Sequence, residues 1–492
     1  MRFGPRVTWG VAALVFALAA TATNALPGAE PDSPKGKSAA QVFKAGAAAS
    51  NVTPWLDEPV VGGWKSAPAE HIHDELWARC LVLDNGDRRL AIVLVDNLSV
   101  GSGLVTEAKR QIEEKTGLPP RSVLIAATHT HSSIAARAGN ELKPEVQLSE
   151  YARFVARRVA DGVRRAVNQL EPARIAWGAG IEEKQVFNRR WFLDPEVKLH
   201  DPFGGTDQVQ MNPGANSDRL LRPAGPVDPQ VSFLAVQSVD GRPIALLANY
   251  SLHYVGGVGP GHISADYFGA FADRMQELLR ADRLDPPFVA MMSNGTSGDI
   301  NNINFREKRK KQPSYEQIRT VADSVAQAVA AEYEKAEFHS WVPLGAALQP
   351  LELAVRKPTP AQLARAKELL AGAKPMPERP HEETYAGRLM SLEEARSTVE
   401  VPLQAMRIGE LGIVGIPFET FAEIGLELKA RSPLKPMFTI ELANGGFGYL
   451  PTPEQHALGG YETWLGTNKV ETEASRKIIE QLLVMLESLK QE

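Results

Sequence analysis

Two histidines one residue apart follow an apolar, β-prone run in this sequence. The run covers residues 122–127, and the histidines are His129 and His131. Because side chains two residues apart on an extended segment point to the same side, both imidazoles can face one cleft at the end of a buried strand. Neutral imidazole is the commonest metal ligand and an acid or base at physiological pH. Two surface histidines in a loop would have the same spacing, so other segments must decide between these readings.

Three further segments share one pattern, an apolar strand that runs into polar residues beside glycine or proline. They carry His253, Asp299 and Glu419. Each has a structural alternative: a core histidine, a plain turn, and a carboxylate that caps the helix expected at 420–430. Open α/β sheets often keep their chemistry at strand ends. Together with His129, the pattern places His, His and Glu where distant segments could share one site.

This donor set is typical of a catalytic metal. A catalytic zinc takes three His or carboxylate ligands and keeps a position open for water. It lowers the pKa of that water to about 7, which makes a nucleophile at neutral pH. Residue types alone leave manganese and iron open.

The elements expected to position these residues alternate between strands and helices. Residues 77–83 and 89–96 form a predicted hairpin around the turn 84–87, and helices are predicted at 104–116 and 151–168. Strands are expected at 231–239, 243–250 and 287–292, and a closing helix at 471–489. No internal sequence repeat is evident. The pattern predicts a single large α/β domain, with a mixed β-sheet flanked by helices and the active site at strand ends.

Residues 350–400 are predicted to be a surface insertion. Exposed, charged helices are expected at 359–370 and 391–400, around a proline-rich stretch at 374–380. The segment 187–229 is rich in Pro, Gly, Asn and Asp, and a loop of this length in a compact domain is usually functional.

Composition excludes several classes of protein. The 492 residues are 43% hydrophobic and 23% charged, with a formal net charge of −5 and no stripe of basic residues, which argues against nucleic acid as a partner. Cys80 is the one cysteine, so no internal disulfide can form. It lies in a predicted strand and is interpreted as a small buried hydrophobe rather than a nucleophile.

The N-terminus has the features of an export signal. Arg2 and Arg6 precede an apolar stretch at 7–20 that is short for a membrane span. The expected organisation is a signal peptide at 1–25, a flexible lead-in at 26–40, and the metallohydrolase domain at 41–492. The protein would then be secreted or periplasmic. An uncleaved anchor is the alternative.

An ordered set of segments resembles the neutral/alkaline (non-lysosomal) ceramidases. The set spans most of the chain beyond the N-terminus, and its members are residues 72–79, 127–132, 187–189, 249–253, 298–299, 416–419, 448–454 and 460–462. The chain ends at Glu492, and so resembles the family's catalytic domain without its C-terminal immunoglobulin-like domain.

The resemblance implies roles for individual residues. The implied zinc ligands are His129, His253, Glu419 and Tyr449. His131 matches a hydrogen-bonding, proton-handling histidine near the metal. Arg189 matches an arginine that holds the substrate or the developing oxyanion. Tyr461 matches a tyrosine that polarises the scissile carbonyl. Such donors are what amide hydrolysis needs beside its nucleophile.

The chain departs from the family at a position that bears on mechanism. Asn301 stands where the family has a serine, and Asn302 replaces the following proline. The family's serine–proline after the arginine is here Arg190 and Trp191. An asparagine cannot be acylated as a serine is, so a metal-activated water is compatible with this change and a serine acyl-enzyme is not.

The resemblance therefore implies an exported, zinc-dependent amidohydrolase. Its cofactor would be Zn²⁺, and its substrate a small or lipid N-acyl amide such as ceramide. A lipid substrate would bring the protein to a membrane surface. The alternatives are an esterase or other metallohydrolase, and a non-catalytic lipid- or carbohydrate-binding relative.

Overall fold

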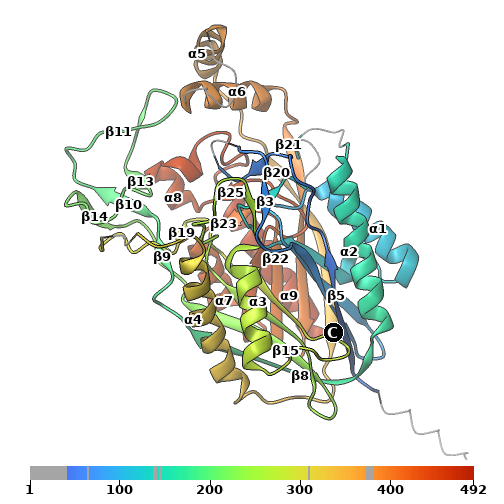
Figure 1. Cartoon of the computed structure of the whole chain (residues 1–492). Helices are drawn as coiled ribbons and strands as arrows, with labels where there is room; N and C mark the ends of the chain where they lie inside the picture. Colours follow the sequence, from blue (N-terminus) through green and yellow to red (C-terminus); the bar gives the residue numbers. More distant parts are fainter. Residues whose placement is uncertain (1–40, 64–65, 137–140, 143–146, 309–310, 373–380) are drawn as a thin grey trace, which may run out of the picture. The chain divides into compact units, whose positions relative to one another are not determined.

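Two β-sheets packed face to face form the centre of the protein (Figure 1). The computed structural model describes residues 41–63, 66–136, 141–142, 147–308, 311–372 and 381–492. The predicted signal peptide, the lead-in at 26–40 and the proline-rich stretch at 374–380 lie outside these residues.

The larger sheet has eight strands in the order β18-β16-β15-β8-β1-β4-β5-β6. Most neighbours are antiparallel, but β5 and β6 are parallel, as are β16 and β18. The predicted hairpin is confirmed as β4 and β5. The strands are β1 (Lys44–Asn51), β4 (Trp77–Asp84), β5 (Arg89–Val95), β6 (Val123–Ala127), β8 (Glu171–Ile181), β15 (Gln230–Ser238), β16 (Pro243–Tyr250) and β18 (Val289–Asn294).

The smaller sheet has four strands in the order β20-β21-β22-β24. They are β20 (Leu344–Ala354), β21 (Thr398–Ile408), β22 (Leu411–Ile416) and β24 (Met437–Glu441). A buried apolar cluster fills the space between the sheets and joins residues such as Leu81, Leu247 and Met291 to Met406 and Phe438.

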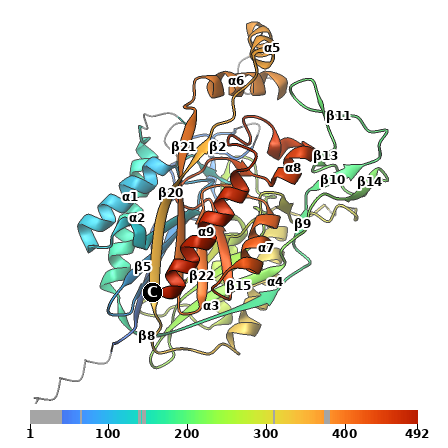
Figure 2. The same cartoon turned by 180° about the vertical axis from the view of Figure 1, so that it is seen from behind.

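Helices cover the outer faces of both sheets (Figures 1 and 2). On the larger sheet, α1 (Ser102–Thr116) and α2 (Glu150–Asn168) pack on the β4–β6 half, and α3 (Asp266–Leu278) and α4 (Glu316–Tyr333) on the β15–β18 half. On the smaller sheet lie α7 (Ala422–Arg431) and α9 (Ala474–Gln491). The predicted α/β class with a mixed sheet flanked by helices is confirmed. The division into two stacked sheets was not predicted.

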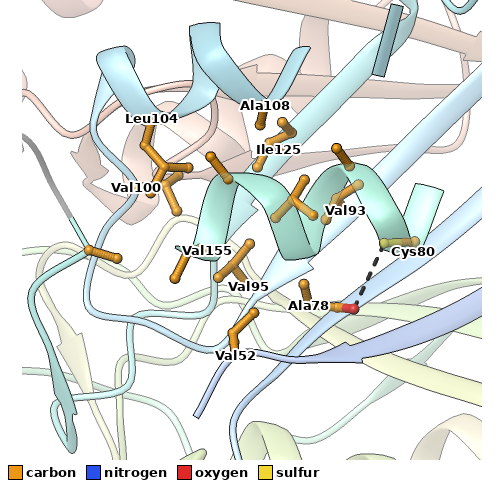
Figure 3. Close-up of a cluster of buried hydrophobic side chains, with 14 of the residues drawn as sticks. Val52, Ala78, Cys80, Val93, Val95, Val100, Leu104, Ala108, Ile125 and Val155 are labelled. Carbon is orange, nitrogen blue, oxygen red and sulfur yellow. Dashed lines mark hydrogen bonds between the residues drawn. The ribbon is translucent and has the colours of Figure 1, made fainter. Parts of the chain in front are cut away.

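The layer between the larger sheet and α1–α2 is a mostly aliphatic core (Figure 3). Val93, Val95 and Ile125 of the sheet meet Leu104 and other residues of the helices, all with at most 4% exposure. Cys80 lies fully buried in this layer, as predicted, and burial raises the pKa of its thiol to about 12.

One connectivity occurs three times among the described residues: a hairpin, a helix, and a strand parallel to the hairpin's second strand. The three units are β4-β5-α1-β6, β15-β16-α3-β18 and β21-β22-α7-β24. In parallel neighbours the carboxyl ends meet at one edge of the sheet. His129 follows β6, His253 follows β16, and Glu419 follows β22. The three units share a topology but no sequence repeat, and this topology brings the three residues to one site.

The predicted helix at 391–400 is wrong. Helix α6 covers His381–Glu393, and β21 already begins at Thr398. Val399 and Val401 are buried while Glu400 is exposed, which is the alternation of a strand. The neighbouring prediction is confirmed by α5 (Pro360–Ala371), which begins with a capping box at Thr359. Both helices lie between β20 and β21.

Short elements complete the part of the chain that the structure describes. The segment 187–229 is not wholly irregular, because it contains six short strands, β9 to β14. The elements are β2 (Val60–Val61), β3 (His71–Ile72), β7 (Ser133–Ile134), β9 (Phe187–Asn188), β10 (Arg190–Leu193), β11 (Leu199–His200), β12 (Thr206–Asp207), β13 (Val209–Met211), β14 (Leu220–Pro223), β17 (His262–Ile263), β19 (Ile300–Asn301), β23 (Glu419–Thr420), β25 (Tyr449–Leu450), α8 (Pro453–Leu458) and two 3₁₀ turns, Pro120–Ser122 and Tyr461–Thr463. None of the described helices has the length and hydropathy to cross a bilayer.

Candidate metal centre

Three imidazoles converge on one point at the strand ends. The Nε2 atom of His129 lies 3.0 Å from Nε2 of His253 and 3.2 Å from Nε2 of His131. His129 and His253 are buried, and His131 is half-buried. All three can offer a ligand atom to a single ion.

Hydrogen bonds fix which nitrogen of each ring carries the proton. The Nδ1 atoms of His129, His131 and His253 face the carbonyl oxygens of Leu98 (2.7 Å), Gly62 (2.9 Å) and Ser297 (3.1 Å). Because a carbonyl oxygen can only accept, each Nδ1 donates, and the neutral rings turn bare Nε2 lone pairs toward one another. Lone pairs at this separation repel, unless a proton or a metal ion lies among them.

The backbone around His129 is held in an uncommon conformation. Backbone pairing with the β5 side of the sheet continues beyond the end of β6, because Thr128 N donates to Val95 O and His129 N donates to Asn97 O. His129 then adopts a φ of 73°, in the left-handed region that non-glycine residues rarely occupy. Such strain persists where surrounding contacts over-determine it, commonly at functional sites.

His253 is supported from behind by a serine and a buried carboxylate. The Ser297 hydroxyl lies 3.3 Å from Nδ1 of His253 and donates to Glu441 Oε1 at 2.7 Å. The other oxygen of Glu441 accepts from the backbone N–H groups of Ser297 and Thr420. Glu441 is fully buried at the end of β24. Outer-shell partners of this kind orient a metal-binding imidazole.

Glu419 and Tyr449 face each other in register across two short parallel strands, β23 and β25. The loop after β18 packs against the same place, where Gly298 N donates to Thr420 O. A Cβ on Gly298 would lie 2.6 Å from the carbonyl oxygen of Glu419, so only glycine permits this approach. The close packing fixes the direction in which the Glu419 side chain leaves its strand.

The Glu419 carboxylate points at the imidazole cluster. Its Oε2 atom lies 3.4 Å from Nε2 of His129 and 3.9 Å from Nε2 of His253. This atom is buried and has no hydrogen-bond partner among the described residues. An orphaned carboxylate oxygen beside imidazole lone pairs is the donor set of a divalent metal such as zinc, and the site fits one.

The charge balance agrees with that fit. Burial, and then the charge on His129, holds the pKa of His131 and His253 well below the usual value, so both rings are neutral and able to act as ligands. Burial also lowers the pKa of His129, but the negative charge of Glu419 has the larger combined effect, and the pKa of His129 is raised. A proton on His129 therefore competes with a metal ion for the same place.

Two arginines and a glutamate brace Tyr449. Arg189 Nη2 donates to the Tyr449 hydroxyl at 3.0 Å, and Arg189 Nε donates to Glu462 at 3.0 Å. Arg190 donates to the other Glu462 oxygen at 2.7 Å. Burial, and then the Glu419 charge, raises the pKa of Tyr449 well above its ordinary value. The Tyr449 hydroxyl is thus protonated unless a cation replaces the proton.

A cavity of about 620 Å³ opens onto these residues. Its walls include His129, His131, Glu419, Tyr449 and Tyr461. The Tyr461 ring lies edge-on to that of Tyr449, with centroids 5.7 Å apart. Burial raises the pKa of Tyr461 to about 12, so its phenol stays a hydrogen-bond donor at neutral pH. A bound molecule would meet this donor beside the imidazole cluster.

The structure brings together six of the seven predicted site residues and places the seventh behind them. Arg189 is not part of the cavity wall and reaches the cluster through Tyr449. Asn301 also lies off the described wall, where its side-chain amide donates to Asn212 and its oxygen accepts from Ile303 N. Asp299 accepts hydrogen bonds from Asn188 and from the first residue of α7.

Sequence reasoning missed three residues of this centre, namely Ser297 as a partner of His253, Glu441 and Glu462. The available signal for Glu441 was weak. A single acid follows the short, mostly apolar run 437–440, and an acid at the end of a strand is also expected without any functional role. Glu462 lies beside the predicted Tyr461, and nothing local in the sequence indicates two arginine partners from residues 189–190.

Comparisons with known proteins agree with this architecture. The family model "Neutral/alkaline non-lysosomal ceramidase, N-terminal" matches residues 43–328. The crystal structure of neutral ceramidase from Pseudomonas aeruginosa is 17% identical and superposes with a TM-score of 0.70, over 92% of this chain and 75% of that one. A structure described as ceramidase complexed with C2 is 18% identical and gives 0.67, over 92% and 76%. At these identities the superpositions establish the shared fold.

Proposed function

The chain belongs to the neutral/alkaline non-lysosomal ceramidase family and is a ceramidase-like hydrolase, and from this premise we propose that it is a zinc-dependent amidase of N-acyl amides. The observation that carries the proposal is the meeting of three imidazole Nε2 atoms with the orphaned Glu419 oxygen. Ceramide is one substrate of the proposed class.

His129, His253, Glu419 and Tyr449 would hold the zinc ion. When bound, zinc would polarise the amide carbonyl and activate a water molecule. Glu419 supplies the negative charge that a divalent ion needs in a buried site, while Ser297 and Glu441 keep the His253 ring in its orientation. Arg189 orients Tyr449 by donating a hydrogen bond to its hydroxyl.

The remaining residues would serve the organic chemistry. Tyr461 donates a hydrogen bond to the carbonyl oxygen as negative charge develops on it. His131, neutral and on the cavity wall, accepts the proton of the attacking water and delivers it to the leaving amine. Arg189 acts through Tyr449, as a positioning residue with a favourable charge near the oxyanion.

A hydrolysis assay with and without a chelator tests the proposal. The purified protein is offered a panel of N-acyl amides, including ceramide, and the matching esters. We expect amide cleavage that a chelator abolishes and added zinc restores, and that His129→Ala lacks at any zinc concentration. Cleavage of esters alone would make the protein an esterase. Ligand binding without turnover by the zinc-loaded protein would contradict the proposal and favour a binding module.

We also propose that the protein is exported, from the charged start and apolar run of residues 2–20. Mass spectrometry of protein produced in a secreting host should find a new N-terminus after Ala22 or Ala25. A chain that retains Met1 and pellets with membranes would contradict cleavage and favour an anchor.

A further inference from the structure

A short buried segment joins β17 to the first turn of α3, and we call residues 264–267 the linking segment. Each of its residues is at most 2% exposed. The segment is not part of the cavity wall that the structure describes. Its hydrogen bonds run to both of the loops that carry the three converging imidazoles. It is therefore placed to act on the cluster without touching a bound molecule.

The linking segment holds the first of these loops on both sides of His131. Thr130 Oγ1 donates to Ser264 O at 2.6 Å, and Ser264 N donates to Ser132 O at 2.9 Å. The residues before and after His131 are thus tied to the same residue of the linking segment. All three partners are at most 2% exposed, so a broken bond would leave buried polar groups unpaired.

The carboxylate of Asp266 holds the second loop after His253. Its Oδ1 atom accepts from Val255 N, and its Oδ2 atom accepts from Gly256 N, both at 2.9 Å. Asp266 adopts a φ of 56°, in the left-handed region, and its Oδ1 atom also accepts from Tyr267 N at 2.7 Å. An uncommon backbone conformation of this kind persists where surrounding contacts over-determine it.

Tyr267 holds the same loop before His253. Its buried hydroxyl donates to Leu252 O at 2.9 Å. The linking segment is itself anchored, because Ala265 N donates to Asp74 Oδ1 at 2.6 Å. The loop that carries His253 is therefore fixed on both sides by two adjacent residues of one anchored segment.

The two loops also touch each other directly. Tyr254 stacks on the ring of His131, with centroids 3.7 Å apart and an interplanar angle of 15°. A Cβ on Gly256 would lie 3.1 Å from the Tyr254 ring, so the backbone that Asp266 holds lies against this ring. The Asp266 carboxylate therefore supports the ring of His131 as well as that of His253.

We propose that Asp266 is a positioning residue of the metal centre. Together with its neighbours in the linking segment, it sets the distance between the ring of His253, which would bind the metal, and the ring of His131, which would handle the proton. The inference rests on the proposed function and adds a residue to it. A misplacement of about 1 Å in such a geometry can lower a rate about 100-fold.

Asp266→Asn tests the hydrogen bonds while sparing the backbone, because asparagine also tolerates the left-handed region. One carboxylate oxygen becomes an NH₂ group that faces a backbone N–H. With zinc bound, kcat should fall about 10–100-fold while KM changes by less than about 3-fold. Cobalt(II), a probe used in place of zinc, should bind about 10–100-fold more weakly and show a visible spectrum different from that of wild type.

Asp228→Asn is the matched control. Asp228 is also buried and accepts from a backbone N–H, that of Gln230, but its hydrogen bonds do not reach either histidine loop. Whatever its effect on stability, this substitution should leave the cobalt affinity and the cobalt spectrum unchanged. Equal changes in Asp228→Asn and Asp266→Asn would reduce Asp266 to a general structural residue and overturn the inference.

A double-mutant cycle tests whether the linking segment joins the two loops. Thr130→Val removes the donor to Ser264 and keeps the side chain's shape. The loss of cobalt affinity in the double variant should differ at least about 3-fold from the product of the two single losses. A loss equal to that product would overturn the inference. Tyr267→Phe, which removes the bond to Leu252 O, replaces Asp266→Asn in the same cycle if that variant does not fold.

The outcomes separate this inference from the proposed function. Wild-type kcat and cobalt affinity in Asp266→Asn would overturn the inference and leave the amidase intact. A wild-type protein that binds cobalt but cleaves no amide would contradict the amidase, and the cobalt affinities would still test Asp266.

A wild-type protein that binds no metal would contradict the proposed function as well. NMR of metal-free protein labelled at its histidine rings then tests the inference. The Tyr254 ring should shift the Cε1–H signal of His131 to high field, and Tyr254→Leu identifies that signal by removing the shift. Asp266→Asn should move the same signal and Asp228→Asn should not. A signal that stays in place in Asp266→Asn would overturn the inference.

Discussion

The Glu441 carboxylate accepts a hydrogen bond from the Ser297 hydroxyl at 2.7 Å, and from the Ser297 backbone N–H at 3.2 Å. Ser297 in turn meets Nδ1 of His253 with both its carbonyl and its hydroxyl. A buried acid on β24 thereby determines the orientation of an imidazole that follows β16. The two strands belong to different sheets, so the metal centre depends on how the sheets stack.

Glu441→Gln should weaken zinc binding about 10–100-fold, the usual cost of losing an outer-shell partner. The substitution keeps the side chain's shape but turns an N–H donor toward the N–H of Ser297 or Thr420. Competition with a chromogenic chelator measures the affinity. Ser297→Ala is the control and should cost less, because His253 still donates to the Ser297 carbonyl. Unchanged zinc affinity in Glu441→Gln would remove this carboxylate from the account.

His131→Ala should separate metal binding from proton transfer. With His129, His253, Glu419 and Tyr449 intact, the variant should keep its zinc and lose about 10²–10⁴-fold in kcat, as expected for a missing general acid/base. Metal analysis beside kinetics measures both effects, with His253→Ala as the zinc-free control. Loss of zinc in His131→Ala would instead assign this ring to the ligands, which its distance of 3.2 Å from His129 also permits.

Much of this site could be predicted because its residues share a local signal. His129, His253 and Glu419 each follow an apolar strand, and such strands can be recognised from periodicity alone. The pairing of distant segments has no such signal. Strands β20 and β21 pair over 11 residues, but two helices separate them in the sequence. No local pattern indicates that the two strands are neighbours, and so the second sheet was missed. Residues 391–400 were misassigned because their charges obscured the alternation that begins at Thr398.

Glu462→Gln should destabilise the whole protein. Glu462 is fully buried between Arg189 and Arg190, which are at most 5% exposed. Removing its charge takes from two buried guanidinium groups the counter-ion that they share, at a cost of about 3–5 kcal/mol. Urea denaturation followed by circular dichroism measures the loss. Glu480→Gln breaks the exposed pair with Arg431 and should change stability by no more than about 1 kcal/mol. Equal midpoints for the two variants would contradict the assigned role of Glu462.

Lys109 should make stability depend on pH. It lies 5% exposed on the inner side of α1, and burial lowers the pKa of its ammonium to about 7 from an ordinary 10.5. Between these values the unfolded chain holds the proton that the folded protein has released. The contribution of this group to stability therefore rises with pH from about 7 to 10.5, and is lost as the pH falls through 7.

Lys109→Met removes this dependence while keeping the aliphatic stem. The variant should exceed wild type by about 1–3 kcal/mol below pH 7, and the difference should shrink toward pH 10.5. Denaturant titrations at several pH values measure it. Lys115→Met, at the end of the same helix and paired with Asp161, is the control. A difference between Lys109→Met and wild type that does not change with pH would show that the Lys109 ammonium reaches water.

Diffraction at the zinc absorption edge, from crystals of the protein purified with zinc, tests the metal centre most directly. We predict one anomalous peak for each chain, at about 2.0–2.2 Å from Nε2 of His129, Nε2 of His253 and Oε2 of Glu419. A protein that hydrolyses amides while its crystals hold no metal ion at this cluster would contradict the account.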